Sequence, residues 1–395
     1  NLDLKETQQV QLSTLTDQWE AEQSIIETIK QKLEAGQPLK DYQADLENLA
    51  MIQGESPMMH LDVTEQSVAE IVENWTGIPV GNMVSDEIDG LLNLEQRLQQ
   101  RVVGQDHAME KIAQAIRISR SGLTDPRKPV GVFMMVGTSG TGKTETALAL
   151  ADYLYGGEQN LITINMSEFK EEHKVSMLLG ASAGYVGYGE GGVLTEAVRK
   201  NPYSVVLLDE MEKAHPGIQD VFYNLFDKGT IKDGEGQDID FKNTLIIMTT
   251  NAATHAMSQY FGKTDVDENE LLEAIRPELL EDFRPAFLGR STIVPYFPLN
   301  QNVLRKIIGI NLSKIEKRLM DHYKAKLSYG DEVMTYLLEK CTDPDTGARN
   351  AENVINKSLL PVISNACLQA LAKGHEISCI NVELTEEEGF IAVVS

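Results

Sequence analysis

One loop, residues 137–144, limits the possible folds of this chain more than any other feature. It contains Gly137, Thr138, Ser139, Gly140, Thr141, Gly142, Lys143 and Thr144. The apolar run 132–136 precedes the loop and the helix-forming segment 145–151 follows it, a context typical of a phosphate-binding loop. Its glycines let backbone N–H groups face a polyphosphate at the positive end of the helix dipole. The alternative is a glycine turn between a strand and a helix, with no ligand.

The loop predicts that the chain binds ATP or GTP together with Mg²⁺. Lys143 would reach the β- and γ-phosphates, and the hydroxyl of Thr144 would hold the metal ion. Further along the chain, the apolar run 205–208 ends at Asp209 and Glu210. Asp209 is expected to hold the same Mg²⁺ and Glu210 to act as the base that polarises the attacking water. The alternative for the two carboxylates is a pair that caps the next helix.

Other polar residues follow the same series of strands. Asn251, after the run 245–248, would orient the water or sense the γ-phosphate, or else only form a turn. Arg290 precedes the fifth strand and could project into a neighbouring subunit's nucleotide as an arginine finger; the alternative is a surface salt bridge. Arg284 is a less favoured candidate for the same role. Arg349, in a second domain, could reach the same phosphates and couple them to domain closure.

A glycine-rich loop at 184–192 carries Tyr185 and Val186. So many glycines favour a mobile surface loop, where an aromatic side chain is costly to expose without a use. We interpret it as a loop in which Tyr185 and Val186 grip an extended polypeptide. The alternative is a second phosphate nest with a packed tyrosine. The acidic loop 233–236 could line the same path.

The composition excludes several classes of protein. The chain has 395 residues, enough for two or three domains, and a formal net charge of −25. This charge argues against a nucleic-acid partner, because phosphate contacts need clustered Lys and Arg. The three cysteines are too few and too widely spaced for a disulfide framework or a zinc site, which favours a cytoplasmic protein. No apolar run approaches about 18 residues, so membrane insertion is not expected.

Hydrophobic periodicity divides the chain into four regions. Residues 101–299 alternate strand and helix, which predicts an α/β fold with a parallel sheet and helices on both faces. Its apolar runs are 132–136, 161–164, 205–208, 245–248 and 293–296. Residues 300–395 predict a small α+β domain. Its expected elements are helices at 303–323, 332–340 and 348–371 and strands at 325–329, 376–384 and 390–394.

The first 60 residues predict part of a coiled coil, and residues 61–100 connecting helices and a linker. Apolar residues follow a heptad seam that misses one position at Glu22. They are Leu12, Leu15, Trp19, Ile26, Ile29 and Leu33. An antiparallel second arm is expected from residue 42, the alternative being a simple amphipathic surface helix. The start lacks both an initiating Met and a basic region, so we expect a fragment rather than a signal peptide.

Together these motifs resemble the second AAA+ module of the two-ring Clp ATPases, from about residue 62 onward. The resemblance rests on the segments 75–80 (WTGIPV), 101–105 (RVVGQ), 137–144, 165–169 (NMSEF), 184–187 (GYVG), 208–215 (LDEMEKAH) and 347–349 (GAR). It implies a homo-hexameric ring that uses ATP to pull a polypeptide through its pore. It also implies that Val102 and Val103 line the adenine pocket, that Tyr185 lies on the pore loop, and that the small domain is a lid. The coiled coil would belong to a middle domain, with a first ATPase ring and an amino-terminal domain upstream.

Within this family, the segments 155–165, 226–229 with 233–236, and 294–299 are most similar to the ClpV branch, the ATPases of bacterial type VI secretion. That similarity implies extraction of sheath protein from contracted tails. A general ClpB-type disaggregase would share every catalytic residue and stays open. A protease-docking unfoldase is disfavoured, because 252–280 lacks an Ile-Gly-Phe or Ile-Gly-Leu loop. Two departures from the family pattern are Gly289 before the candidate finger and Asn350 after the Gly-Ala-Arg motif.

Overall fold

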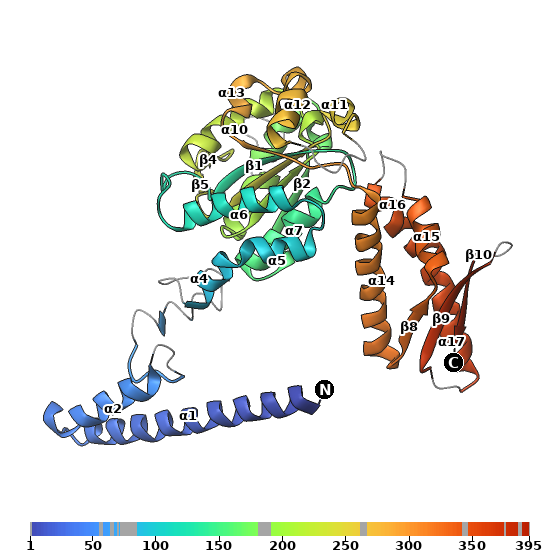
Figure 1. The fold of residues 1–395 in the computed structure, drawn as a ribbon. Helices are drawn as coiled ribbons and strands as arrows, with labels where there is room; N and C mark the ends of the chain where they lie inside the picture. Colours follow the sequence, from blue (N-terminus) through green and yellow to red (C-terminus); the bar gives the residue numbers. More distant parts are fainter. Residues whose placement is uncertain are drawn as a thin grey trace. The chain divides into compact units, whose positions relative to one another are not determined.

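The computed structural model describes residues 2–54, 58–63, 67–68, 71, 85–180, 191–260, 267–341, 347–374, 377–385 and 389–394 (Figure 1). The chain forms two compact units, residues 1–82 and residues 83–395, and each is described by itself. Among the described residues, no helix has the length and apolar character needed to cross a bilayer.

The first unit is built on a helical hairpin. A long helix, α1 (Leu2–Glu34), is followed by a 3₁₀ turn (Leu39–Asp41) and by α2 (Gln43–Gln53). The pairing is antiparallel, because Lys32 of α1 forms an ion pair with Asp45 at the start of α2 (2.6 Å), while Glu22 meets Gln53 at its end. Ile26, Ile29 and Leu49 are buried together between the helices. The expected antiparallel arm is therefore present.

The expected seam is confirmed only at Ile26 and Ile29. Leu12, Leu15 and Trp19 are 66%, 50% and 42% exposed, and Leu33 is 45% exposed. For the first three the reason is length, since α1 has 33 residues and α2 only 11, and α2 ends beside Glu22.

Glu22, the missed position of the seam, is the polar anchor of this hairpin. Glu22 is fully buried, and its carboxylate accepts hydrogen bonds from the backbone N–H groups of Met58 (2.9 Å) and Met59 (3.0 Å). The side-chain amides of Gln18 (3.0 Å) and Gln53 (3.4 Å) donate to it as well. Burial alone would raise the pKa of this carboxyl, but the hydrogen bonds outweigh burial and lower it. The charged form therefore stabilises the hairpin.

We expect Glu22→Gln to destabilise the hairpin at pH 7 by about 1–3 kcal/mol, because it removes charge-assisted hydrogen bonds. A carboxyl with a lowered folded-state pKa stabilises above its unfolded value and loses that contribution as the pH falls through the folded value. The difference between the two proteins should thus shrink below pH 4.5. Urea unfolding followed by Trp19 fluorescence, in a Trp75→Phe background, measures it. A difference that stays constant from pH 7 to pH 3 would contradict this role.

The second unit contains a parallel five-stranded sheet with the strand order β2-β3-β6-β1-β7. The strands are β1 (Gly131–Val136), β2 (Leu161–Asn165), β3 (Val205–Asp209), β6 (Leu245–Thr250) and β7 (Thr292–Pro295). Val136 pairs with Thr250, and Asn165 pairs with Asp209. The carboxyl ends of these strands, and the loops that follow them, therefore meet at one edge of the sheet.

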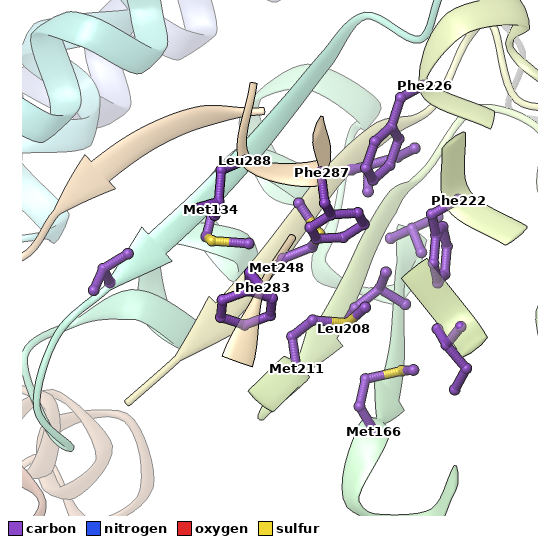
Figure 2. Packing of buried hydrophobic residues seen from close by; sticks show 14 of the residues in the cluster. Met134, Met166, Leu208, Met211, Phe222, Phe226, Met248, Phe283, Phe287 and Leu288 are labelled. Carbon is purple, nitrogen blue, oxygen red and sulfur yellow. The ribbon is translucent and has the colours of Figure 1, made fainter. Parts of the chain in front are cut away.

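Helices cover both faces of this sheet, as the sequence predicts. On one face, Phe133 and Met135 pack against α5 (Leu94–Arg101), α6 (Asp106–Arg120) and α7 (Lys143–Tyr155). On the other face, the alternate residues Met134 and Val136 join a core with many methionine and phenylalanine side chains (Figure 2). The helices around that core are α8 (Glu172–Leu179), α9 (Val193–Lys200), α10 (Gly217–Lys228), α11 (Thr254–Ser258), α12 (Glu268–Asp282) and α13 (Pro285–Leu288). Helix α4 (Ser85–Leu92) precedes α5.

A short hairpin, β4 (Thr230–Lys232) and β5 (Asp238–Asp240), carries the acidic loop 233–236. The sequence does not predict it, because strands of three residues show no clear alternation.

The last part of the second unit has its own hydrophobic core, as expected for a small α+β domain. Its helices are α14 (Gln301–Tyr323), α15 (Asp331–Glu339), α16 (Gly347–Val354) and α17 (Leu360–Ala372). Its strands β8 (Lys326–Tyr329), β9 (Cys379–Thr385) and β10 (Gly389–Val394) form a sheet in the order β10-β9-β8. The single helix expected at 348–371 is interrupted by a π-helical turn, Ile355–Leu359. Pro361 lacks the N–H group that a regular helix needs there.

Candidate functional site

A cleft of about 460 Å³ lies in the second unit, at the carboxyl ends of β1, β3 and β6 and beside α14 and α16. It has the volume of a cofactor site. The residues predicted from the sequence that line it are Val102, Val103, Ser139, Gly140, Thr141, Gly142, Lys143, Thr144, Asp209, Glu210, Asn251 and Arg349. The fold therefore gathers side chains from positions more than 200 residues apart along the chain.

The glycines of the loop are required by its geometry. Gly140 and Gly142 have φ angles of +73° and +105°, which L side chains rarely adopt. At Gly137, an added Cβ would lie 2.9 Å from the Cβ of Tyr296. The loop can thus curl closely against β7 and turn its N–H groups toward the cleft.

Lys143 is held inside the loop. Lys143 is only 8% exposed. Its ammonium donates hydrogen bonds to the carbonyls of Gly137 and Thr138 and to Oδ1 of Asn251 (3.0 Å). Burial lowers the pKa of this ammonium to about 8, although the nearby charge of Asp209 opposes the shift. Lys143 is therefore expected to lose its proton at a lower pH than an ordinary lysine does.

Because the pKa of Lys143 is lowered, we expect the affinity for nucleotide to depend on pH. An ammonium binds a polyphosphate better than an amine does, so above pH 8 binding must be coupled to proton uptake. We expect the dissociation constant of ATP to be flat below pH 7.5 and to rise by up to about tenfold per pH unit above pH 8. Calorimetric titration from pH 7 to 9.5 measures it, in two buffers of different ionisation enthalpy to count the protons.

Lys143→Arg is the matched control, because a guanidinium stays charged throughout this range. Its ATP affinity should be lower but nearly independent of pH. A wild-type affinity that does not change between pH 7.5 and 9.5 would contradict the lowered pKa.

Asp209 and Glu210 are connected through a buried hydroxyl. Thr249 donates a hydrogen bond to Oδ1 of Asp209 and accepts one from the backbone N–H of Glu210 (3.1 Å). Glu210 has a φ of +59°, a left-handed conformation that is unusual for a side chain of this size. Its Oε1 lies 3.3 Å from Nζ of Lys213. Both carboxylates belong to residues that line the cleft, but they have different partners: Thr249 of β6 for Asp209 and Lys213 for Glu210.

Part of the lining of the cleft is apolar. Val102, Val103 and Leu148 line it from the large subdomain, and Ile307 and Ile310 line it from α14. Asn311, Lys314 and Glu352 add polar groups.

A lining that combines aliphatic side chains with a glycine loop suits a nucleoside triphosphate, whose base packs against aliphatic groups and whose phosphates face backbone N–H groups. The oxygens of Thr144 and Asp209 fit Mg²⁺, which takes one or two protein ligands, phosphate oxygens and waters. The residues present therefore suit both groups.

The remaining predicted site residues do not line the cleft or fall outside the described residues; Gly137 and Thr138, at the start of the glycine loop, are among those that do not line it. Arg290 follows α13 and forms an ion pair with Asp227 of α10 (2.9 Å), and Arg284 pairs with Asp220. Neither arginine lines the cleft of its own subunit. Tyr185 and Val186 fall within 181–190, outside the described residues, so their placement stays a prediction.

Sequence reasoning missed Gln105, which is completely buried. Its amide Nε2 donates to the carbonyls of Thr141 in the glycine loop (3.1 Å) and of Phe297 after β7 (2.9 Å). Its Oε1 accepts from the backbone N–H of Phe297 (2.9 Å). Phe297 is three residues before Asn300, the N-cap of α14. Gln105 thus ties the glycine loop to the segment that enters the small subdomain, a role that residue type and spacing do not show.

A parallel sheet with a glycine loop after β1, adjacent carboxylates at the end of β3 and a small α+β subdomain over the cleft defines an ATPase of the AAA+ class. A family model described as "AAA domain (Cdc48 subfamily)" matches residues 128–294, and one described as "C-terminal, D2-small domain, of ClpB protein" matches residues 299–379. The chain belongs to the Clp family of AAA+ ATPases, in the group that contains ClpV and ClpB. The resemblance found in the motifs is thereby confirmed.

The relatives are similar over most of this chain. The AAA+ ATPase ClpV1 of Pseudomonas aeruginosa is 47% identical over 342 residues, which are 86% of this chain and 38% of ClpV1. The chaperone protein ClpB of Yersinia enterocolitica is 45% identical over 372 residues, which are 90% of this chain and 42% of ClpB. A solved structure of Hsp104 in a closed state, with ATPγS and FITC casein, is 31% identical with a TM-score of 0.71, and the match covers 94% of this chain and 63% of Hsp104. The chain thus spans less than half the length of these two curated relatives.

Proposed function

We propose that this chain is the ATP-hydrolysing module of a homo-hexameric ring motor that threads polypeptide through a central pore. The observation that carries the proposal is the cleft, in which Lys143, Asp209 and Glu210 of the large subdomain and Arg349 of the small one line a single space. A site built from two subdomains can change its shape when the nucleotide changes, which is how hydrolysis can drive movement.

Each side chain has a distinct task in this proposal. Val102 and Val103 hold the adenine, and the N–H groups of the loop and Lys143 hold the phosphates. Mg²⁺, held by Thr144 and Asp209, supplies neutralisation of developing phosphate charge. Glu210 accepts the proton of the attacking water.

The remaining polar residues sense and complete the site. Asn251, whose Oδ1 accepts from Lys143 (3.0 Å), orients the attacking water. Arg349, which lies in α16 of the small subdomain, binds the γ-phosphate and so couples the presence of that phosphate to the position of the small subdomain. Arg290 completes the site of a neighbouring subunit from outside.

For the substrate, we infer a polypeptide gripped by Tyr185 and Val186. Hsp104 in the matched structure is accompanied by casein, which supports a polypeptide substrate here. The 47% identity to ClpV1, with the ClpV-like segments, favours the contracted type VI sheath in a bacterial cytoplasm. The match of residues 299–379 to the ClpB small domain and the 45% identity to ClpB keep general disaggregation as the second candidate.

One experiment separates these substrates. ATP turnover of the intact protein is measured alone, with contracted type VI sheath and with aggregated protein. We expect stimulation by sheath, accompanied by shortening of the sheath in electron micrographs. Stimulation by aggregates alone would assign the chain to disaggregation. Tyr185→Ala is the control, because it should leave ATP turnover intact and abolish the shortening.

A further inference from the structure

Helix α10 carries an acidic face that holds both candidate finger arginines. Asp220 and Asp227 are two helical turns apart and so lie on the same side of α10. Arg284 pairs with Asp220, and Nε of Arg290 donates to Oδ2 of Asp227 (2.9 Å). The guanidinium of Arg290 also lies 5.2 Å from the ring centre of Tyr223, which is on the same helix.

The contacts of Arg290 fix one side of its guanidinium and leave the other usable. Nε of Arg290 donates to Asp227, and Nη1 donates one hydrogen bond to the carbonyl of Ala286 (2.9 Å). An arginine carries five N–H donors, so the terminal fork keeps donors for a planar anion. The side chain is 36% exposed, so the arginine is oriented without being buried.

Aromatic packing supports this arrangement. Arg290 is two residues after the end of α13, whose Phe287 packs 5.4 Å, centre to centre, from Phe226 of α10. Phe283 also packs against Phe287 (6.0 Å), and Figure 2 shows the three rings in the same core. Asp227 follows Phe226 directly, so this core holds the part of α10 that carries it beside Arg290.

We propose that Asp227 is a positioning residue for Arg290: it holds the guanidinium by Nε so that the terminal fork points out of the subunit toward a phosphate in its neighbour. This inference rests on the proposed ring. The Asp220–Arg284 pair has the same chemistry on the same helix, but in this proposal it is a surface ion pair with no role in catalysis. An exposed ion pair contributes little to folding, so removing either carboxylate should leave the fold intact.

The test compares Asp227→Asn with Asp220→Asn in the assembled protein. We expect Asp227→Asn to lower kcat on the order of 10- to 100-fold with the KM for ATP unchanged, since misplacing a reacting group costs rate rather than binding. Asp227→Glu, which keeps the carboxylate, should recover much of the rate. Asp220→Asn should stay within about twofold of wild type. The reverse pattern, with Asp220→Asn impaired and Asp227→Asn normal, would overturn the inference and move the finger to Arg284.

Mixed rings show where Asp227 acts. Asp227→Asn subunits keep an intact cleft, and Glu210→Gln subunits keep an intact Arg290. Rings mixed from the two should hydrolyse ATP faster than the weighted sum of the parents, because the intact clefts then receive a well-placed finger. Additive rates would overturn the inference, since Asp227 would then act within its own subunit.

Arg290→Ala is the reference for these mixtures. If Arg290→Ala alone keeps full turnover, the proposed trans-acting finger itself fails. If Arg290→Ala is inactive and is complemented by Glu210→Gln while Asp227→Asn is not, only the role of Asp227 fails.

Discussion

A Glu210→Gln protein is expected to bind ATP as tightly as wild type and to hydrolyse it about 10²–10⁴-fold more slowly. Glutamine keeps the size of the side chain and the backbone N–H bond to Thr249 (3.1 Å) but cannot accept a proton from water. Glu210 lines the cleft from a left-handed backbone position, directly after the end of β3. Phosphate release and equilibrium binding of a fluorescent ATP analogue measure the two quantities separately.

Glu212→Gln is the matched control for this prediction. Glu212 lies two residues further along, its charge acts on Lys143, and its Oε2 is buried without a hydrogen-bond partner among the described residues. It does not line the cleft, so its substitution should slow turnover by less than about tenfold. A large loss in Glu212→Gln with a small one in Glu210→Gln would show that the base has been assigned to the wrong carboxylate.

Gln105→Leu is expected to lower the free energy of unfolding by about 2 kcal/mol or more and to weaken ATP binding. Leucine fills similar space but leaves the buried carbonyl of Thr141 and the two partly buried backbone groups of Phe297 without their hydrogen-bond partner. A fully buried group left in this way costs roughly 1–3 kcal/mol, and a partly buried group costs less. ATP affinity should fall as well, because Thr141 belongs to the glycine loop. Urea unfolding followed by far-ultraviolet circular dichroism and an ATP titration measure the two effects.

Gln99→Leu provides the comparison. Gln99 is near Gln105 in the chain and only partly buried, and its amide makes one long bond to Glu95 of its own helix (3.5 Å). Its substitution should change stability by no more than about 0.5 kcal/mol. Equal urea midpoints for the two variants would rule out the structural role of Gln105.

Long apolar strands and the glycine loop could be predicted from the sequence because their signals are local. Each central strand is a run of mostly buried apolar residues, and β1 leads directly into Gly137, where the tight contact with Tyr296 leaves no room for a side chain. The short strands β4 and β5 and the π-helical turn before Pro361 gave no comparable periodic signal.

Residues that act through distant partners were not predictable. Gln105 bonds to backbone groups 36 and 192 residues away, and no pattern of residue types encodes those partners. Glu22 looked like a gap in a heptad seam, because its partners are mostly backbone N–H groups and amides beyond α1. The cleft is different, because the carboxyl ends of parallel strands must meet at one edge of the sheet. The sequence therefore predicts that Asp209, Glu210 and Asn251 lie close together, as they do in the lining of the cleft.

If the proposed function is right, hydrolysis at this cleft drives movement of a polypeptide. The most direct measurement is the ATP-dependent unfolding of a fluorescent protein fused to a sheath segment, recorded with wild-type and Glu210→Gln protein at equal ATP occupancy. We expect loss of fluorescence at a rate that follows ATP turnover in wild type, and stable binding without unfolding in Glu210→Gln. Equal unfolding by the two proteins would contradict it, because the work would then not come from hydrolysis at Glu210.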